Sequence, residues 1–200
     1  MIAIIDYGMG NLRSVQKALE VAGGTASIVS RPEDILKADK LVMPGVGAIR
    51  PAMDKLKELG LVESIKTYIS SGKPFLGICL GFQLLFESST EGGDVKGLGI
   101  LKGTVDRFQG SVKVPQMGWN TIQKTPNGEG MFKDVPEGSF VYFCHSYFVN
   151  PQDKSVTATF TDYGIPYTSS ICVKNIWGTQ FHPEKSQAVG LTILKNFVLL

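Results

Sequence analysis

The sequence predicts an α/β fold with a mostly parallel central sheet flanked by helices and a β-rich extension in the second half. The first half alternates short apolar runs with stretches of helical periodicity, which is the pattern of a parallel sheet covered by helices. After about Gly97 the chain changes to short β-rich pieces separated by turn residues. The length of 200 residues and the apolar fraction of 43% fit one domain, residues 1–200, with its own core.

The elements of the first half follow from apolar spacing. Residues 2–5 form an apolar run typical of a buried strand. Leu12, Val15 and Leu19 then recur at helical spacing, and Gly23-Gly24 supplies a C-terminal stop. The other elements expected in this half are strands at 26–29, 41–43 and 75–78 and helices at about 51–59 and 62–69.

The second half contains mainly strands. Its clearest strands are expected at 140–149, 156–160 and 176–181, with turns at 127–128, 137–138 and 162–164. A final helix from about 188 to 199 would cover the sheet again. No repeat or linker-like stretch divides the chain, so the β-rich half is expected to extend the same domain.

Composition excludes several classes of function. Twenty basic and 18 acidic residues leave a net charge of +2 without a dense basic run, so we expect neither a nucleic-acid binder nor a membrane-surface protein. Three cysteines without C-x-x-C spacing and two histidines give no disulfide framework or zinc site. The segment 6–11 resembles a dinucleotide fingerprint, but Arg13 stands at the third glycine position. We therefore expect a cytoplasmic protein without metal or cofactor.

The sharpest local signal is the segment Gly77–Gly81, which reads G-x-C-x-G between an expected strand and the helix-capable run 82–86. This is the form of a nucleophile elbow with Cys79 as the nucleophile. An isolated cysteine is more often a buried core residue, but two flanking glycines and the strand-to-helix context favour the nucleophile. A position at a helix N-terminus would also stabilise the thiolate.

A cysteine nucleophile needs a base, and His182 is the better of the two histidines. His182 follows an apolar strand and precedes Glu184 by two residues, so in extended backbone both side chains would face the same side. Glu184 could then orient the imidazole. His145 has no such carboxylate nearby, and the adjacent Cys144 should face the opposite way. The alternative for His182 is a surface or capping residue beside a proline.

Acyl transfer also needs two hydrogen-bond donors for the oxyanion. The backbone N–H of Leu80, directly after the nucleophile, is one candidate. The loop Gly45-Val46-Gly47 follows a strand and would supply the second from Val46 or Gly47. Glycines on both sides of Val46 allow its peptide units more than one orientation. An ordinary tight turn explains this loop equally well.

Taken together, these residues resemble the class I, or triad, glutamine amidotransferases over essentially the whole chain. The resemblance is carried, in order, by Ile5–Asn11, Pro44–Gly47, Gly77–Leu85, Pro115–Asn120, His145–Tyr147 and Gln180–Ser186. The cysteine and histidine segments identify the family. The first segment and the Met-Gly-Trp-Asn segment resemble the members that serve histidine biosynthesis.

The resemblance implies hydrolysis of glutamine to glutamate and ammonia, with the ammonia passed to a partner (β/α)8 cyclase subunit. Cys79 would attack the amide, His182 would transfer protons and Glu184 would orient His182. Substrate-binding positions are implied at Gln83, Glu91, His145, Ser146 and Tyr147, and partner-interface positions at Asn11, Trp119 and Asn120.

Three alternatives remain open. A glutaminase of the anthranilate or guanylate synthase type would keep the triad but lack the first and the Met-Gly-Trp-Asn segments. A stand-alone cysteine hydrolase or peptidase would share the elbow and need no partner. A subunit that binds its partner without turnover would not need an intact set of Cys79, His182 and Glu184.

Overall fold

The computed structural model describes all 200 residues. The first half contains β1 (Ile2–Ile5), α1 (Leu12–Val21), β2 (Ala26–Val29), α2 (Pro32–Lys37), β3 (Lys40–Gly45), α3 (Ile49–Glu58), α4 (Leu61–Ser70), β4 (Phe75–Cys79) and α5 (Leu80–Gln83). The second half contains β5 (Phe86–Ser89), β6 (Val95–Lys96), β7 (Leu101–Arg107), β8 (Gln116–Thr121), β9 (Gln123–Lys124), β10 (Phe140–His145), β11 (Tyr147–Pro151), β12 (Thr157–Asp162), β13 (Pro166–Val173), β14 (Ile176–Thr179) and α6 (Gln187–Val198). Short 3-10 turns cover Pro126–Gly128, Lys154–Val156 and Pro183–Lys185.

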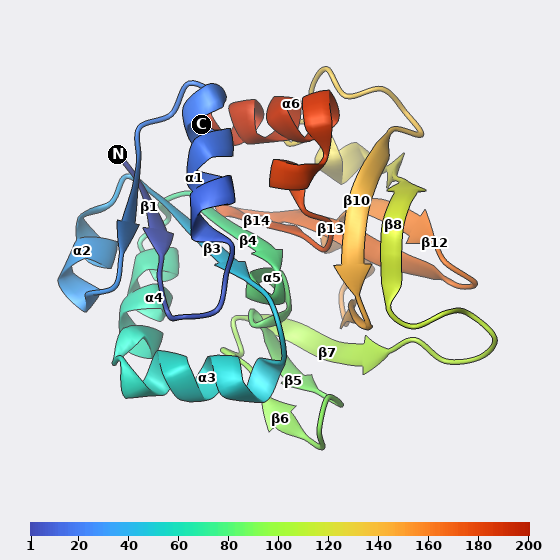
Figure 1. Cartoon of the computed structure of the whole chain (residues 1–200), viewed down its shortest axis with the longest axis horizontal. Helices are drawn as coiled ribbons and strands as arrows, with labels where there is room; N and C mark the ends of the chain where they lie inside the picture. Colours follow the sequence, from blue (N-terminus) through green and yellow to red (C-terminus); the bar gives the residue numbers. More distant parts are fainter.

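One large mixed sheet organises the molecule (Figure 1). Its strands run in the order β2-β1-β3-β4-β14-β13-β11-β7-β5-β6, and the first five are parallel. The pairs around β13 and β11 are antiparallel, while β8 and β10 form a separate two-stranded antiparallel sheet. The late strand β14 lies beside β4, with Thr179 paired to Ile78. The segments that follow β4 and β14 therefore begin side by side.

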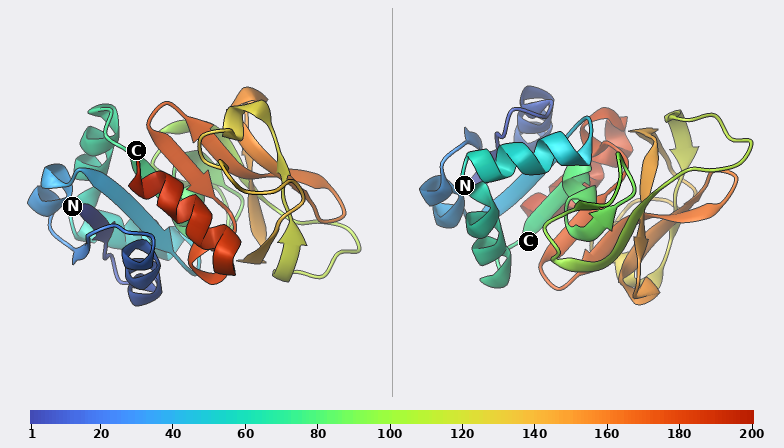
Figure 2. Two further views of the ribbon diagram at one scale, coloured as in Figure 1. Left: turned by 90° about the horizontal axis from the view of Figure 1, so that it is seen from above. Right: turned by 90° about the horizontal axis from the view of Figure 1, so that it is seen from below.

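Helices cover both faces of the parallel part of the sheet, as the two views in Figure 2 show. Side chains of β1 alternate between the two cores, since Ala3 and Ile5 join one and Ile2 and Ile4 the other. The first core packs against α2, α3 and α4, and the second packs against α1 and α6. Each of these helices buries one apolar face and leaves the other in solvent. No helix is long and apolar enough to cross a bilayer.

The α/β fold with a mostly parallel sheet and a β-rich second half is confirmed. The expected first-half strands and helices are present, with boundaries shifted by at most two residues. The six-residue helix α2 was not predicted from the sequence, although Pro32 at its start and acidic residues in its first turn are N-terminal signals. A helix follows Cys79 as expected, but the helix-capable run 82–86 is helical only to Gln83, because α5 ends there and β5 begins at Phe86.

The expectation of one strand over 140–149 is also wrong. The chain bends at Ser146, so β10 pairs with β8 while β11 pairs with β7 and β13 in the large sheet. Only the polar residues His145 and Ser146 interrupt this aromatic-rich run, and neither is a strong turn residue. The bend follows from the two different pairing partners of β10 and β11. The result places residues 145–147 at a corner between the two sheets.

Candidate active site

Cys79 occupies a sharp strand-to-helix turn. It is the last residue of β4, directly precedes α5, and has φ 53° and ψ −107°, a conformation that is rare for a residue with a side chain. A Cβ atom at Gly81 would collide with the carbonyl oxygen of Met43, and one at Gly77 would lie 2.9 Å from Cα of Phe82. Both glycines are thus required by the close approach of β3, β4 and α5. The elbow predicted from the sequence is present in the structure.

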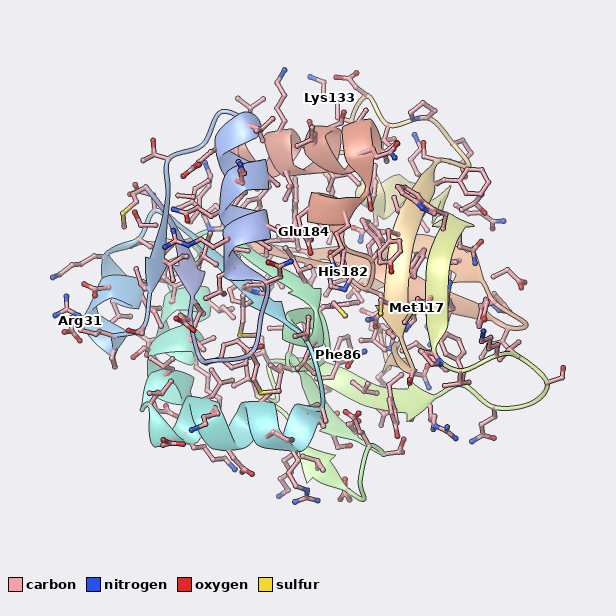
Figure 3. The ribbon with its side chains drawn as sticks, viewed as in Figure 1. Arg31, Phe86, Met117, Lys133, His182 and Glu184 are labelled. Carbon is pink, nitrogen blue, oxygen red and sulfur yellow. The ribbon has the colours of Figure 1, made fainter.

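His182 and Glu184 form a pair with buried side chains, and Figure 3 shows the two residues close together. Nδ1 of His182 lies 2.8 Å from Oε1 of Glu184, and the Glu184 side chain is only 2% exposed. The contact is made within the 3-10 turn Pro183–Lys185 and not across extended backbone, because β14 ends at Thr179. The sequence therefore anticipated the contact, but the backbone conformation that makes it is different.

Neighbouring charges decide the protonation of His182. Burial by itself lowers its pKa, but the charge and hydrogen bonding of Cys79 and then of Glu184 outweigh this and raise the pKa to about 10. His182 is therefore an imidazolium at neutral pH, with Glu184 on one ring nitrogen and Cys79 nearby. Such a pairing stabilises a cysteine as the nucleophilic thiolate.

The elbow opens into a cavity of about 270 Å³. The sequence-predicted residues that line it are Val46, Gly47, Cys79, Leu80, Gln83, Glu91, His145, Ser146, Tyr147 and His182, and the cavity is completed by Pro115, Cys144 and Lys185. A larger hollow of about 720 Å³ around Pro74 and Ile176 lies at the other end of β4 and β14 and contains none of the predicted site residues. The smaller cavity is therefore the candidate active site.

Backbone groups hold two of the polar side chains of this cavity. Nε2 of Gln83 donates to the carbonyl oxygen of Tyr147 at 2.8 Å and to Oε1 of Gln180 at 3.1 Å. Oε2 of Glu91 accepts from the N–H of Ile49 at 2.9 Å, at the N-terminus of α3. Glu91 is thus fixed at the cavity wall by a helix end, where its negative charge is stabilised.

His145 differs from His182 in its surroundings. Its Nδ1 lies 2.8 Å from the carbonyl oxygen of Tyr147, and its Nε2 lies 3.3 Å from the hydroxyl of Tyr167. Burial lowers the pKa of His145 to about 4 despite the hydrogen bond to Tyr147, and the charge of His182 adds to the effect. His145 is therefore neutral, and it donates through Nδ1.

Of the N–H groups expected to form an oxyanion hole, that of Leu80 is free of a helical acceptor and that of Val46 is already hydrogen-bonded. Leu80 is the first residue of α5, so its N–H has no acceptor within the helix. The N–H of Val46, in contrast, donates to the carbonyl oxygen of Met9 at 3.3 Å. Gly47 follows with φ 98°, a conformation that favours glycine. In this conformation, one candidate donor is bound to the segment that leads into α1.

The expected interface residues lie on two surfaces. Asn11 is exposed at the start of α1. Trp119 is 46% exposed and shares one face of the β8–β10 sheet with Met117 and Phe140, at 65% and 59%. We call these three side chains the β8–β10 apolar patch. Asn120 differs, because its amide donates to the Asp162 carbonyl and accepts from the Thr121 N–H within the chain.

Sequence reasoning missed one fully buried polar residue of the site. Gln180 lies two residues before His182, and its Nε2 donates to Sγ of Cys79 at 3.8 Å. Its place beside the nucleophile depends on the pairing of β14 with β4, which no local pattern reveals.

Comparison with known proteins agrees with this geometry. The family model described as glutamine amidotransferase class-I matches residues 3–200. The fold is similar to that of a solved glutamine amidotransferase (TM-score 0.77, 16% identity, all of both chains covered) and of PurLQS from Thermotoga maritima (TM-score 0.73, 16% identity, 99% of this chain and 97% of that chain). The chain belongs to the class I glutamine amidotransferase family.

Closer relatives narrow the assignment. The chain is 54% identical to imidazole glycerol phosphate synthase subunit HisH of Aquifex aeolicus, covering 97% of this chain and 94% of that one. It is 52% identical to the same subunit of Syntrophotalea carbinolica, with 98% of both chains covered. Its function is that of the glutaminase subunit of imidazole glycerol phosphate synthase, in histidine biosynthesis.

Proposed function

We propose that Cys79, His182 and Glu184 form the triad that hydrolyses glutamine to glutamate and ammonia. The observation that carries this proposal is the meeting of an elbow cysteine and a buried His182–Glu184 pair at one small cavity. The charged state of His182 supports it, since an imidazolium both stabilises the Cys79 thiolate and can give up a proton.

The reaction divides into acylation and deacylation. The Cys79 thiolate attacks the side-chain amide carbon of glutamine, and the His182 imidazolium protonates the departing nitrogen, so that ammonia and a glutamyl thioester form. Neutral His182 then takes a proton from water as the water attacks the thioester, and glutamate leaves with recovery of the thiolate and imidazolium. Glu184 holds Nδ1 of His182 through both steps.

The remaining cavity residues would position the substrate. Gln83, Glu91 and the segment His145–Tyr147 surround the cavity, and a polar wall of this kind suits the charged amino and carboxylate groups of glutamine. Leu80 N–H would be one oxyanion donor. The second would come from the loop at Val46 and Gly47 once the Val46 peptide is released from Met9.

The ammonia would pass to a (β/α)8 cyclase subunit that makes imidazole glycerol phosphate and AICAR, within a cytoplasmic heterodimer. The curated relatives are themselves named as synthase subunits. The β8–β10 apolar patch supports a partner beside the active site, because the face that carries Trp119 and Phe140 also carries Cys144 at the cavity wall. Asn11 and Asn120 would lie at or near this interface.

The Cys79→Ala variant tests the proposed chemistry. We expect it to fold, to bind the cyclase and to release no ammonia from glutamine, while free ammonia still supports the cyclase reaction. Retained glutamine hydrolysis in this variant would show that the triad assignment is wrong. His182→Ala should lose several orders of magnitude in kcat, as removal of a triad base does in other enzymes.

A further inference from the structure

Gln180 is the one polar side chain that links the nucleophile to the substrate-binding wall. It follows β14 directly, just as α5 follows β4, and the pairing of Thr179 with Ile78 brings it beside Cys79. Its side chain is completely buried. Nε2 of Gln180 donates to Sγ of Cys79 at 3.8 Å, and Oε1 accepts from Nε2 of Gln83 at 3.1 Å.

The orientation of this amide is dictated by its neighbours. The carbonyl oxygen of Tyr147 can only accept, so Gln83 must turn its NH₂ group toward that side. The second hydrogen of the same NH₂ group then points at Gln180, which must present its oxygen. The NH₂ group of Gln180 is therefore left facing the sulfur. A flipped amide would set two donors against each other and place an oxygen against a thiolate.

We infer that Gln180 is a positioning residue that donates a hydrogen bond to the Cys79 thiolate and holds the sulfur in its attacking orientation. A hydrogen bond to the charged form favours that form, and a buried, preorganised donor needs no rearrangement to supply it. This inference rests on the proposed role of Cys79 as nucleophile. Gln180 is then a neutral hydrogen-bond donor to the thiolate, in addition to the charged His182, and the two residues stabilise the thiolate together.

The hydrogen bonds of Gln83 and Gln180 also connect the cavity wall at Tyr147 to the sulfur of Cys79. The carbonyl oxygen of Tyr147 accepts from both Gln83 and Nδ1–H of His145, so three residues of the substrate wall meet at one atom. A shift of Tyr147 on glutamine binding would move Gln83, and through it Gln180 and the sulfur. The position of the Cys79 sulfur therefore depends on the position of the Tyr147 carbonyl group in the cavity wall.

The test is the pH dependence of Cys79 alkylation by iodoacetamide, followed by mass spectrometry of the Cys79 peptide. Gln180→Met retains length and volume but lacks the donor, and Gln180→Glu retains the acceptor for Gln83 and replaces the NH₂ group with oxygen. Gln180→Met should shift the alkylation midpoint upward by about one to two pH units, the effect of losing a hydrogen bond to a charged group. Gln180→Glu should shift the midpoint upward at least as far, because a carboxylate would also repel the thiolate. Thr179→Val is the matched control, because the buried Thr179 hydroxyl has no hydrogen-bond partner to lose.

The other groups near the thiolate do not change in these variants. The titratable ones are His145, His182, Glu91, Lys185, Cys144, Tyr7, Tyr147 and Tyr167. The carbonyl oxygen of Cys144 also lies 3.9 Å from Sγ of Cys79 and is unchanged. Burial raises the pKa of the Tyr7 and Tyr167 phenols above their ordinary value, so both stay neutral through the titration. If the two Gln180 variants keep the native midpoint, the inference is overturned, whatever happens to turnover. Glutamine hydrolysis by Cys79→Ala would instead overturn the proposed function, and since alkylation needs no glutamine, the two failures are distinguishable.

Discussion

The two histidines of the chain are in opposite charge states because of their neighbours. His182 lies against a carboxylate and a thiol, which raise its pKa to about 10 against the effect of burial. His145 is enclosed by aromatic rings, including Phe108 and Phe143, and burial lowers its pKa to about 4. The two imidazoles thus differ in charge because of their environments, although both residues line the same cavity.

This assignment predicts the titration of both residues. Carbon-13-labelled histidine should give two ring signals, one titrating near pH 4 and one near pH 10, with neither moving between pH 6 and 7. Glu184→Gln should lower the higher pKa and reduce kcat, but by less than His182→Ala. A signal that titrates near the ordinary value of about 6.5 in the native protein would contradict the burial and pairing of that residue.

The same shifts predict how stability depends on pH. Because folding lowers the pKa of His145, its contribution to the free energy of unfolding is complete above about pH 6.5 and is lost as pH falls toward 4. Because folding raises the pKa of His182, its contribution is complete below about pH 6.5 and is lost as pH rises toward 10. Urea unfolding of His145→Gln should lack the acid-side loss and keep the alkaline one.

At the junction of β3, β4 and α5 the backbones lie so close together that Gly81 has no room for a side chain. Gly81→Ala would drive a methyl group into the carbonyl oxygen of Met43, so β3 and α5 would have to separate. We expect a loss of about 1–3 kcal/mol or more in the free energy of unfolding, together with loss of glutaminase activity as the Cys79 turn opens. Urea denaturation and ammonia release measure the two effects.

Gly130→Ala is the matched control for this substitution. Gly130 has open space around its Cα and a backbone conformation that other residues adopt, so its variant should keep native stability and activity. Equal stability of the Gly81 and Gly130 variants would show that the close packing at the elbow is not required.

The spacing of apolar residues and glycines along the sequence predicted the elements whose conformation depends on neighbouring residues in the chain. Residues 2–5 are apolar throughout and lie in a buried parallel strand, and the helical spacing of Val15 and Leu19 gave α1 correctly. The Gly77–Gly81 segment likewise gave the elbow, because the glycines that its close packing requires stand in the local sequence, although their contacts include Met43 of β3. The bend at Ser146 and the hydrogen bond of Gln180 were missed, since both depend on strands distant in the chain. His182 and Glu184 were paired correctly through spacing, although the turn between them was not foreseen.

On the scale of the whole molecule, the position of the active site favours a partner that covers it. The β8–β10 apolar patch places Met117 and Trp119 in solvent on the face that leads to the cavity wall at Cys144. Met117→Lys should weaken binding of the cyclase in calorimetry and leave the isolated chain folded. Leu36→Lys on α2, at the far end of the molecule in Figure 1, changes an equally apolar exposed residue and should leave the affinity unchanged. Equal affinities of the two variants would contradict the interface assignment.

The other expected interface surface, at Asn11, leads to a prediction about control of the glutaminase. Val46 N–H is bound to the Met9 carbonyl, in the segment that runs into α1 at Asn11, so a partner that contacts this segment can change which acceptor the Val46 peptide meets. Loss of one oxyanion donor typically costs about 10²–10³ in rate, enough to keep hydrolysis slow until the cyclase is present.

We therefore expect kcat for glutamine hydrolysis to rise from the isolated chain to the complex, and further when the cyclase binds its own nucleotide ligand. Gly47→Ala should raise the kcat of the isolated chain and so reduce this activation, because φ 98° belongs to the resting loop and disfavours any residue with a side chain. Its effect should be larger on kcat than on KM, since an oxyanion donor acts mainly in the transition state. Equal kcat values for the isolated chain, the complex and the liganded complex would exclude the switch and leave the loop as a fixed structural turn.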